Sequence, residues 1–220
     1  MVEICRHRSI DHWEKQCYDE IVNVISAAKG DVNIAISGGR TPVKVYNRVG
    51  LYLRNSLPTN VKKLRFFLVD ERDAPLGSPR SNSTMALKTI GKQHVIPFDP
   101  KAESAEDYFE KIAVALGEGG CFDLVVLGCG SDGHTASLFP NTSLIYGEKE
   151  SFSINELPSG ELRYSMTFPL ILKAAKRVVF VNSDVQKLKF FRTEDVTAGS
   201  LPIHKILASP QTKAILHETV

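Results

Sequence analysis

The chain has 220 residues, a net charge of +2 and 43% hydrophobic residues, which are ordinary values for a globular protein and exclude a disordered or fibrous one. No apolar stretch approaches the roughly 18 residues that a membrane span needs. The sequence also lacks the long run of Lys and Arg that is typical of a nucleic-acid-binding surface. Neither a membrane nor a nucleic acid is therefore an expected partner.

Helices and buried strands alternate along the first half of the sequence. Apolar residues spaced three and four positions apart over residues 10–28 predict an amphipathic helix, with Ser9 as its N-cap. Thr41 and Pro42 are typical of a helix start, as a cap and a first-turn proline. The predicted elements of this half are helices over 10–28, from 41 onward and over 85–90, and strands over 32–36 and 64–69.

The second half repeats this alternation. The predicted elements are strands over 95–98, 122–127, 177–181 and 213–216, and helices over 105–116 and 184–191. The least regular span, 140–163, is interpreted as a surface excursion that can serve as a lid. Strands that are apolar on both faces and alternate with helices are typical of a parallel sheet covered on both sides, so we expect one α/β domain over residues 1–220.

The four cysteines, Cys5, Cys17, Cys121 and Cys129, form no CxxC pair and no Cys/His cluster with zinc spacing. We therefore expect free thiols and no metal site. The first residues contain no apolar segment of the kind found in a signal peptide, which makes the cytoplasm the expected location.

Polar, glycine-rich segments follow three of the predicted strands, where an open parallel sheet binds its ligands. The first is Ser37-Gly38-Gly39-Arg40-Thr41. Its backbone N–H groups, its hydroxyls and Arg40 can cradle a phosphate at the start of the next helix. The alternative is a simple strand-to-helix turn that needs small residues. The segment matches neither the Walker A motif nor the dinucleotide-binding motif.

The other two segments carry titratable side chains. Asp70-Glu71-Arg72 is either part of a site or a solvated strand end in which a carboxylate pairs with the arginine. In Gly128 to His134, Asp132 and His134 are two positions apart, so the carboxylate can orient the imidazole as a general base. The alternative is a histidine that caps a helix start. No G-x-S-x-G elbow supports a serine hydrolase.

Motifs along nearly the whole chain resemble those of the 6-phosphogluconolactonase family, which belongs to a larger group with glucosamine-6-phosphate deaminase. The string Thr135 to Pro140 follows the lactonase form. Asn141 stands where the family usually has glycine, and Asn tolerates a positive φ. The matching motifs are ISGGRTP at 36–42, DER at 70–72, SN at 81–82, GCGSDGHTASLFP at 128–140, RYSMTFPLI at 163–171, VNSDVQK ending at Lys187 and LPIHKIL at 201–207.

The resemblance implies an αβα sandwich with a mainly parallel, Rossmann-like sheet and no cofactor. It implies hydrolysis of 6-phosphoglucono-δ-lactone to 6-phosphogluconate in the oxidative pentose phosphate pathway, so the expected partner is this sugar-phosphate lactone. We expect a monomer or a weak homodimer. The implied roles are general base for His134, its partner for Asp132, phosphate binding for Arg40, Arg163 and Lys187, and a site arginine for Arg72; Ser37, Gly38, Gly39, Thr41, Asp70, Asn82 and Gly130 complete the expected substrate site.

Two other functions stay open at this point. In a sugar-phosphate isomerase or deaminase, Asp70 would shuttle protons and His134 would assist ring opening, although the Thr135 to Pro140 string argues against this reading. A sugar-phosphate sensor would need only the phosphate cradle, and the intact Asp132 and His134 pair argues against it.

Overall fold

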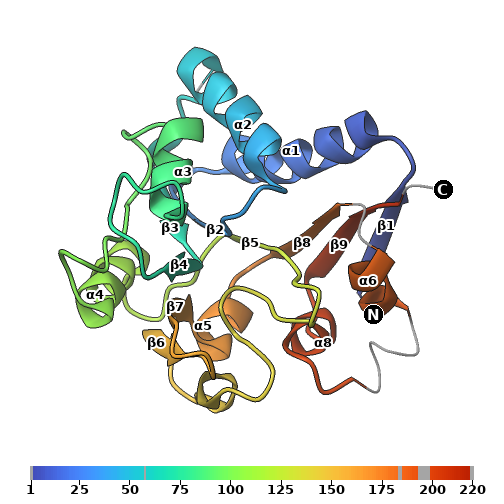
Figure 1. The fold of residues 1–220 in the computed structure, drawn as a ribbon. Coiled ribbons are helices and arrows are strands. Elements are labelled where there is room, and N and C mark those ends of the chain that lie inside the picture. The colour runs from blue at the N-terminus through green and yellow to red at the C-terminus, as the bar shows by residue number, and fades with distance from the viewer. Residues whose placement is uncertain (1, 57, 183–184, 193–198, 219–220) are drawn as a thin grey trace.

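Six parallel strands form the central sheet, as the apolar strand pattern predicts (Figure 1). The computed structural model describes residues 2–56, 58–182, 185–192 and 199–218. The chain runs from β2 outward to β3, and then returns to place β5, β8 and β9 on the other side of β2. The strand order therefore reverses its direction between the neighbouring strands β2 and β5. Ligands of open parallel sheets bind at such a topological switch point, beyond the carboxyl ends of the strands. The strand order is β1 (Glu3–His7), β9 (Thr212–His217), β8 (Arg177–Asn182), β5 (Leu124–Leu127), β2 (Gly30–Ile36) and β3 (Val61–Leu68).

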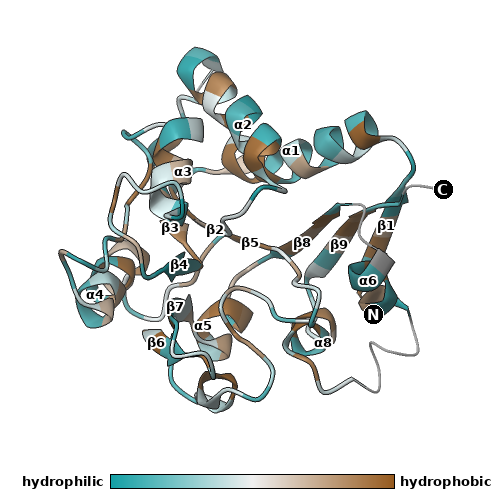
Figure 2. Cartoon of the chain, in the orientation of Figure 1, coloured by the Kyte–Doolittle hydropathy of each residue, from teal (hydrophilic) through white to brown (hydrophobic). Residues whose placement is uncertain are grey.

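Helices cover both faces of this sheet and confirm the predicted αβα sandwich (Figure 1). Successive side chains of β2 point to opposite faces, so Ile34 joins one apolar cluster and Ala35 joins the other. The apolar strands and the inward helix faces stand out in Figure 2. One layer holds α1 (Ile10–Ala27), α2 (Val43–Ser56) and α3 (Asn82–Thr89), and the other holds α4 (Ala105–Leu116), α5 (Phe168–Leu172) and α8 (Pro202–Leu207).

Local capping explains where these helices begin. The Ser9 hydroxyl accepts a hydrogen bond from the His12 backbone N–H at 3.4 Å, which confirms its predicted role at the start of α1. Pro42 precedes the first residue of α2 rather than lying within its first turn. The helix predicted over 85–90 begins earlier, at Asn82, because Ser81 caps the backbone N–H of Thr84 at 3.0 Å.

A second, antiparallel sheet corrects two predictions. It contains β4 (Asp70–Arg72), β7 (Leu162–Met166) and β6 (Phe152–Glu156). Residues 70–72 are thus a strand of their own rather than the polar end of β3. The span 140–163 is more regular than predicted, because it contains the 3-10 helix η1 (Ser143–Tyr146), β6 and the start of β7. Its role as a lid stays a prediction. Phe152 and Met166 anchor this sheet in the core.

Smaller differences concern the ends of the central sheet. The edge strand β1 was not predicted, because Glu3–His7 mixes charged and apolar residues without clear alternation. The predicted strand 95–98 is reduced to one bridge between Val95 and Phe66. Of the predicted helix 184–191, residue 184 lies outside the described residues, and the remainder is α6 (Val185–Leu188) followed by the 3-10 helix η2 (Lys189–Phe191).

The four cysteines are free thiols, as predicted, with Cys17 and Cys129 buried and the other two half-buried. In the ranges that the structure describes, no helix is long and apolar enough to cross a bilayer. The same ranges contain no cluster of three or more His, Cys, Asp or Glu side chains that could hold a metal ion.

Candidate active site

A cavity of about 400 Å³ lies beyond the carboxyl ends of β2, β5 and β8. This cavity lies at the carboxyl ends of the strands, where the sequence argument placed the candidate site. Two predicted site residues, Asp132 and Arg163, do not line it. The predicted site residues in the wall are Ser37, Gly38, Gly39, Arg40, Thr41, Asp70, Arg72, Asn82, Gly130, His134 and Lys187.

The described wall residues carry more positive than negative charge. Arg40, Arg72 and Lys187 are cationic, and Asp70 is the acidic residue of the wall. The carboxylate is already engaged, because Ser137 Oγ donates to its Oδ2 at 2.8 Å and Asn82 Nδ2 lies 3.3 Å from its Oδ1. The cavity is thus suited to a small anion such as a phosphate ester.

The turn after β2 approaches α3 too closely for any side chain at residue 38. A Cβ on Gly38 would lie 1.9 Å from Oδ1 of Asn82. The Asn82 amide in turn donates to the Asp70 carbonyl at 2.9 Å. The same turn is also bonded to α2, because the Tyr46 hydroxyl donates to the Ser37 carbonyl at 3.1 Å. These contacts fix the predicted cradle against Asp70, the first residue of β4.

Glu71 organises this region, a role that the sequence does not reveal. Its fully buried carboxylate accepts hydrogen bonds from the backbone N–H groups of Asn82 and Ser83, both at 2.7 Å, and from the Ser81 hydroxyl at 3.0 Å. Burial raises the pKa of Glu71 against the opposing effect of these backbone donors. The carboxylate therefore secures the N-terminus of α3, and it also accepts the Arg72 backbone N–H at 2.8 Å. Among the described residues, no ion pair joins it to the Arg72 guanidinium.

The loop after β5 brings Asp132 and His134 together, as predicted. Oδ1 of Asp132 lies 2.5 Å from Nδ1 of His134 and also accepts the His134 backbone N–H at 3.1 Å. Burial raises the pKa of Asp132, but these two hydrogen bonds and the charge of the imidazole outweigh it, so the pKa lies below its ordinary value. An ionised Asp132 accepts a hydrogen bond from the Nδ1–H of His134, which leaves the lone pair that a general base needs on Nε2.

The backbone of this loop closes tightly around the imidazole. The Gly130 N–H donates to the His134 carbonyl at 2.8 Å, and the Gly133 N–H donates to the Gly130 carbonyl at 3.1 Å. A Cβ on Gly130 would lie 2.2 Å from Nδ1 of His134. Asn141, farther along the chain, has a φ of 65°, which is the positive value expected where it takes the place of a glycine. The glycines thus serve to place the histidine at the cavity wall.

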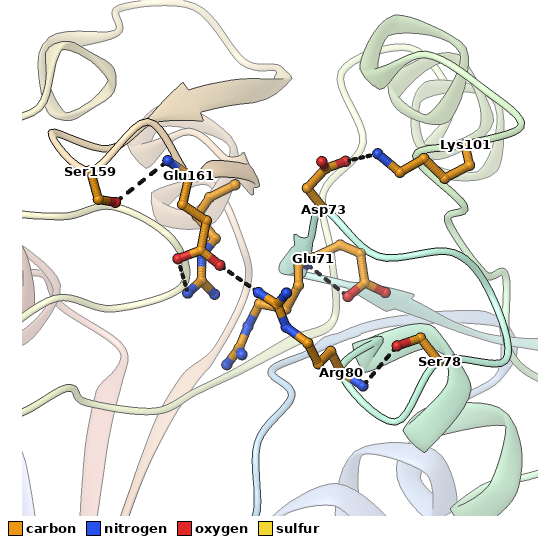
Figure 3. A network of polar contacts seen from close by, with 9 residues as sticks. Glu71, Asp73, Ser78, Arg80, Lys101, Ser159 and Glu161 are labelled. Atoms are coloured by element: carbon orange, nitrogen blue, oxygen red, sulfur yellow. Dashed lines mark hydrogen bonds and ion pairs between the residues drawn. The ribbon is translucent and has the colours of Figure 1, made fainter.

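Two arginines of the second sheet lie at one side of the cavity, and Arg72 is the one that lines it. Arg72 and Arg163 face each other across the β4–β7 ladder. Arg163 donates to Glu161 at 3.2 Å, and Arg80 contacts the same carboxylate at 2.6 Å. Figure 3 shows Arg80 and Glu161 pointing toward each other, so an ion pair joins the β6–β7 hairpin to the loop before α3.

Some wall residues were not singled out from the sequence. Asn182 ends β8, and its Oδ1 lies 2.7 Å from Nδ1 of His217. The same strand-end rule, applied to β8, would have found it. Ser131 also lines the cavity, whereas Ser137 is buried against Asp70.

Comparisons with known proteins point to one family. A family described as glucosamine-6-phosphate isomerases/6-phosphogluconolactonase matches residues 8–215. The chain is 34% identical to a 6-phosphogluconolactonase of Synechocystis over 78% of this chain and 74% of that protein. It is 31% identical to a 6-phosphogluconolactonase of Chlamydia pneumoniae over 72% of this chain and 63% of that protein. A solved 6-phosphogluconolactonase from Trypanosoma cruzi superposes with a TM-score of 0.81 at 26% identity, over 99% of this chain and 94% of that one.

Proposed function

Because the chain belongs to the glucosamine-6-phosphate isomerase/6-phosphogluconolactonase family, we propose that it hydrolyses 6-phosphoglucono-δ-lactone to 6-phosphogluconate. The names of its relatives and the lactonase form of the Thr135 to Pro140 string support this branch of the family. In this role the chain serves the oxidative pentose phosphate pathway, and it needs neither metal nor cofactor. The cytoplasmic location, the single domain and the oligomeric state stay predictions.

The observation that carries the mechanism is the 2.5 Å contact between Asp132 and His134 beside a cationic cavity. His134 Nε2 takes a proton from a water molecule as the water oxygen attacks the lactone carbonyl. Asp132 holds the imidazole in the required tautomer and stabilises the imidazolium. When the tetrahedral intermediate collapses, the bond from the carbonyl carbon to the ring oxygen breaks, and His134 returns the proton to that oxygen.

Cations at the cavity hold the phosphate and orient the ring. Arg40 and Lys187 line the wall, and Arg72 lies beside them. Arg163 lies opposite Arg72 in the β4–β7 ladder and outside the cavity wall, so we assign it to phosphate binding through the positive charge that it adds beside Arg72. This remote binding energy positions the carbonyl for attack. Backbone N–H groups of the Gly128 to Gly133 turn, other than those of Gly130 and Gly133 that already donate within the loop, stabilise the developing oxyanion.

The structure offers less support for the deaminase reaction. That reaction would need Asp70 as a mobile proton carrier, but its two oxygens accept hydrogen bonds from Ser137 and Asn82. A sensor would bind the sugar phosphate without any use for the Asp132 and His134 pair. Both readings make distinct predictions for the products.

The test offers the purified chain two substrates in parallel. One reaction contains 6-phosphoglucono-δ-lactone, generated by a dehydrogenase and corrected for spontaneous hydrolysis; the other contains glucosamine 6-phosphate. We expect accelerated acid release from the lactone and no ammonia from the amino sugar. Ammonia release would establish the deaminase reading, and calorimetric binding without turnover would establish the sensor.

A further inference from the structure

The aromatic ring of Phe139 stacks on the imidazole of His134. The ring centroids are 4.2 Å apart and the planes meet at 30°. Such a close, nearly parallel arrangement is an offset stack, which favours one orientation of both rings. Phe139 does not line the cavity. Its position is therefore behind the histidine, where it can support the imidazole without touching the substrate.

The chain folds back to make this contact. In the segment of chain that joins His134 to Phe139, Ala136 adopts a positive φ of 51°. The Leu138 backbone N–H donates to the Thr135 carbonyl at 3.0 Å. A non-glycine residue in this conformation costs about 1 kcal/mol or more and persists only where its surroundings hold it. The tight turn places the Phe139 ring on the imidazole of His134, five positions earlier in the chain.

The turn is anchored to the second sheet. Ser137, within the turn, donates its hydroxyl to Asp70 at 2.8 Å and its backbone N–H to the Ser165 hydroxyl at 3.2 Å. The guanidinium of Arg163 lies 5.9 Å from the centre of the Phe139 ring, at the outer limit of a cation–π contact. Contacts with β4 and β7 thus fix the position of Phe139, and the stacked ring in turn restricts the orientation of the imidazole.

The histidine needs such a support. Asp132 contacts its Nδ1, but the Asp132 side chain is 49% exposed and lies in the same loop as the histidine. One hydrogen bond fixes a single point of the ring and leaves the ring plane free to swing about it. A flat apolar contact fixes the plane, and the two together determine the direction of Nε2.

We propose that Phe139 is a positioning residue for His134, which holds the plane of the imidazole and stabilises the imidazolium formed during proton transfer through its π face. This inference rests on the proposed function, because it assumes that His134 is the general base. Phe139 touches neither the water nor the lactone and acts through the histidine.

The test compares three substitutions. Phe139→Leu keeps an apolar side chain but removes the flat face, and Phe139→Tyr keeps the flat face. Phe109→Leu makes the same change in α4, at a residue that does not line the cavity. We expect Phe139→Leu to lower kcat about tenfold with KM within a few-fold, because a catalytic group displaced by a fraction of an ångström loses much of its effect. Phe139→Tyr restores kcat to within a few-fold of the parent, and Phe109→Leu leaves it unchanged.

A second readout needs no turnover. In the free protein, the ring current of Phe139 shifts the carbon-bound imidazole protons of His134 upfield, and Phe139→Leu moves them back toward their random-coil positions. The His134 signals are assigned by their absence in His134→Gln. Unshifted His134 protons in the parent protein overturn the inference, as does a Phe139→Leu variant with unchanged kcat or an inactive Phe139→Tyr variant. A parent without lactonase activity refutes the proposed function instead, and the proton shifts still report whether the stack exists.

Discussion

Adding a single methyl group at Gly38 tests how the cavity is built. Gly38 has no positive φ, so Gly38→Ala meets no backbone strain and acts only through its Cβ. That atom would lie 1.9 Å from Oδ1 of Asn82, whereas ordinary contact begins at 3.4 Å, so the carboxamide must move by about 1.5 Å. The movement breaks its hydrogen bonds to the carbonyl and carboxylate of Asp70.

Two losses follow from this displacement. Two buried hydrogen bonds at about 1 kcal/mol each give a loss of about 2 kcal/mol in the free energy of unfolding, or a Tm lowered by about 4–8 °C. A misplacement of about 1 Å at the substrate site lowers kcat/KM by about 100-fold. Thermal unfolding followed by circular dichroism and the lactone hydrolysis assay measure the two effects separately.

The control is Gly128→Ala, the same change in the same wall, where the added Cβ has no neighbour within 4 Å. Its Tm should equal that of the parent. In the Asn82→Ala background the clash is absent, so Gly38→Ala should cause little further loss. A full additional loss in that background, or an unchanged Tm and kcat/KM in the parent background, would refute the steric explanation.

Three further predictions concern charge. Lys187→Ala should raise KM for the lactone about tenfold or more with kcat within a few-fold, since it removes a phosphate contact and not the base; an unchanged KM contradicts its role. Arg177→Met should lower the free energy of unfolding by about 3 kcal/mol in urea titrations, because the buried guanidinium donates to the carbonyls of Leu172 and Ala174, among others, and these would lose their donor; a parent-like urea midpoint contradicts this. The pKa of Asp132 is held below its ordinary 3.8, so its carboxylate stabilises the folded state above that pH, and the stabilisation is lost as the pH falls through the lower native value. Asp132→Asn should therefore lose less stability than the parent on acidification below pH 3.8, and identical acid unfolding curves would show that the shift has no energetic consequence.

The central sheet was predictable because each buried strand has a local pattern. Leu124–Leu127 is a continuous apolar run between polar turns, which is typical of a strand covered on both faces. The second sheet has no comparable pattern. Asp70–Arg72 becomes a strand only by pairing with residues 163–165, more than ninety positions later in the chain, and no local pattern reports such a partner.

For the candidate site, too, the residues that follow the buried strands were predictable and the contacts made by tertiary structure were not. Polar residues after parallel strands must meet at one edge, so residues 37–41 and 128–134 were found together. The role of Glu71 depends on where α3 begins in space, and the contact between Phe139 and His134 depends on a positive φ at Ala136. Such contacts arise from tertiary structure, which periodicity and residue type do not encode.

The measurement closest to the central claim is the rate of lactone hydrolysis by His134→Gln, above the spontaneous background. Glutamine preserves the polarity and much of the volume of the side chain but cannot accept the proton of water. We predict that kcat falls by about 10² to 10⁴-fold while KM and Tm stay close to those of the parent. A variant that retains turnover within a few-fold of the parent would contradict the assignment of His134 as the general base.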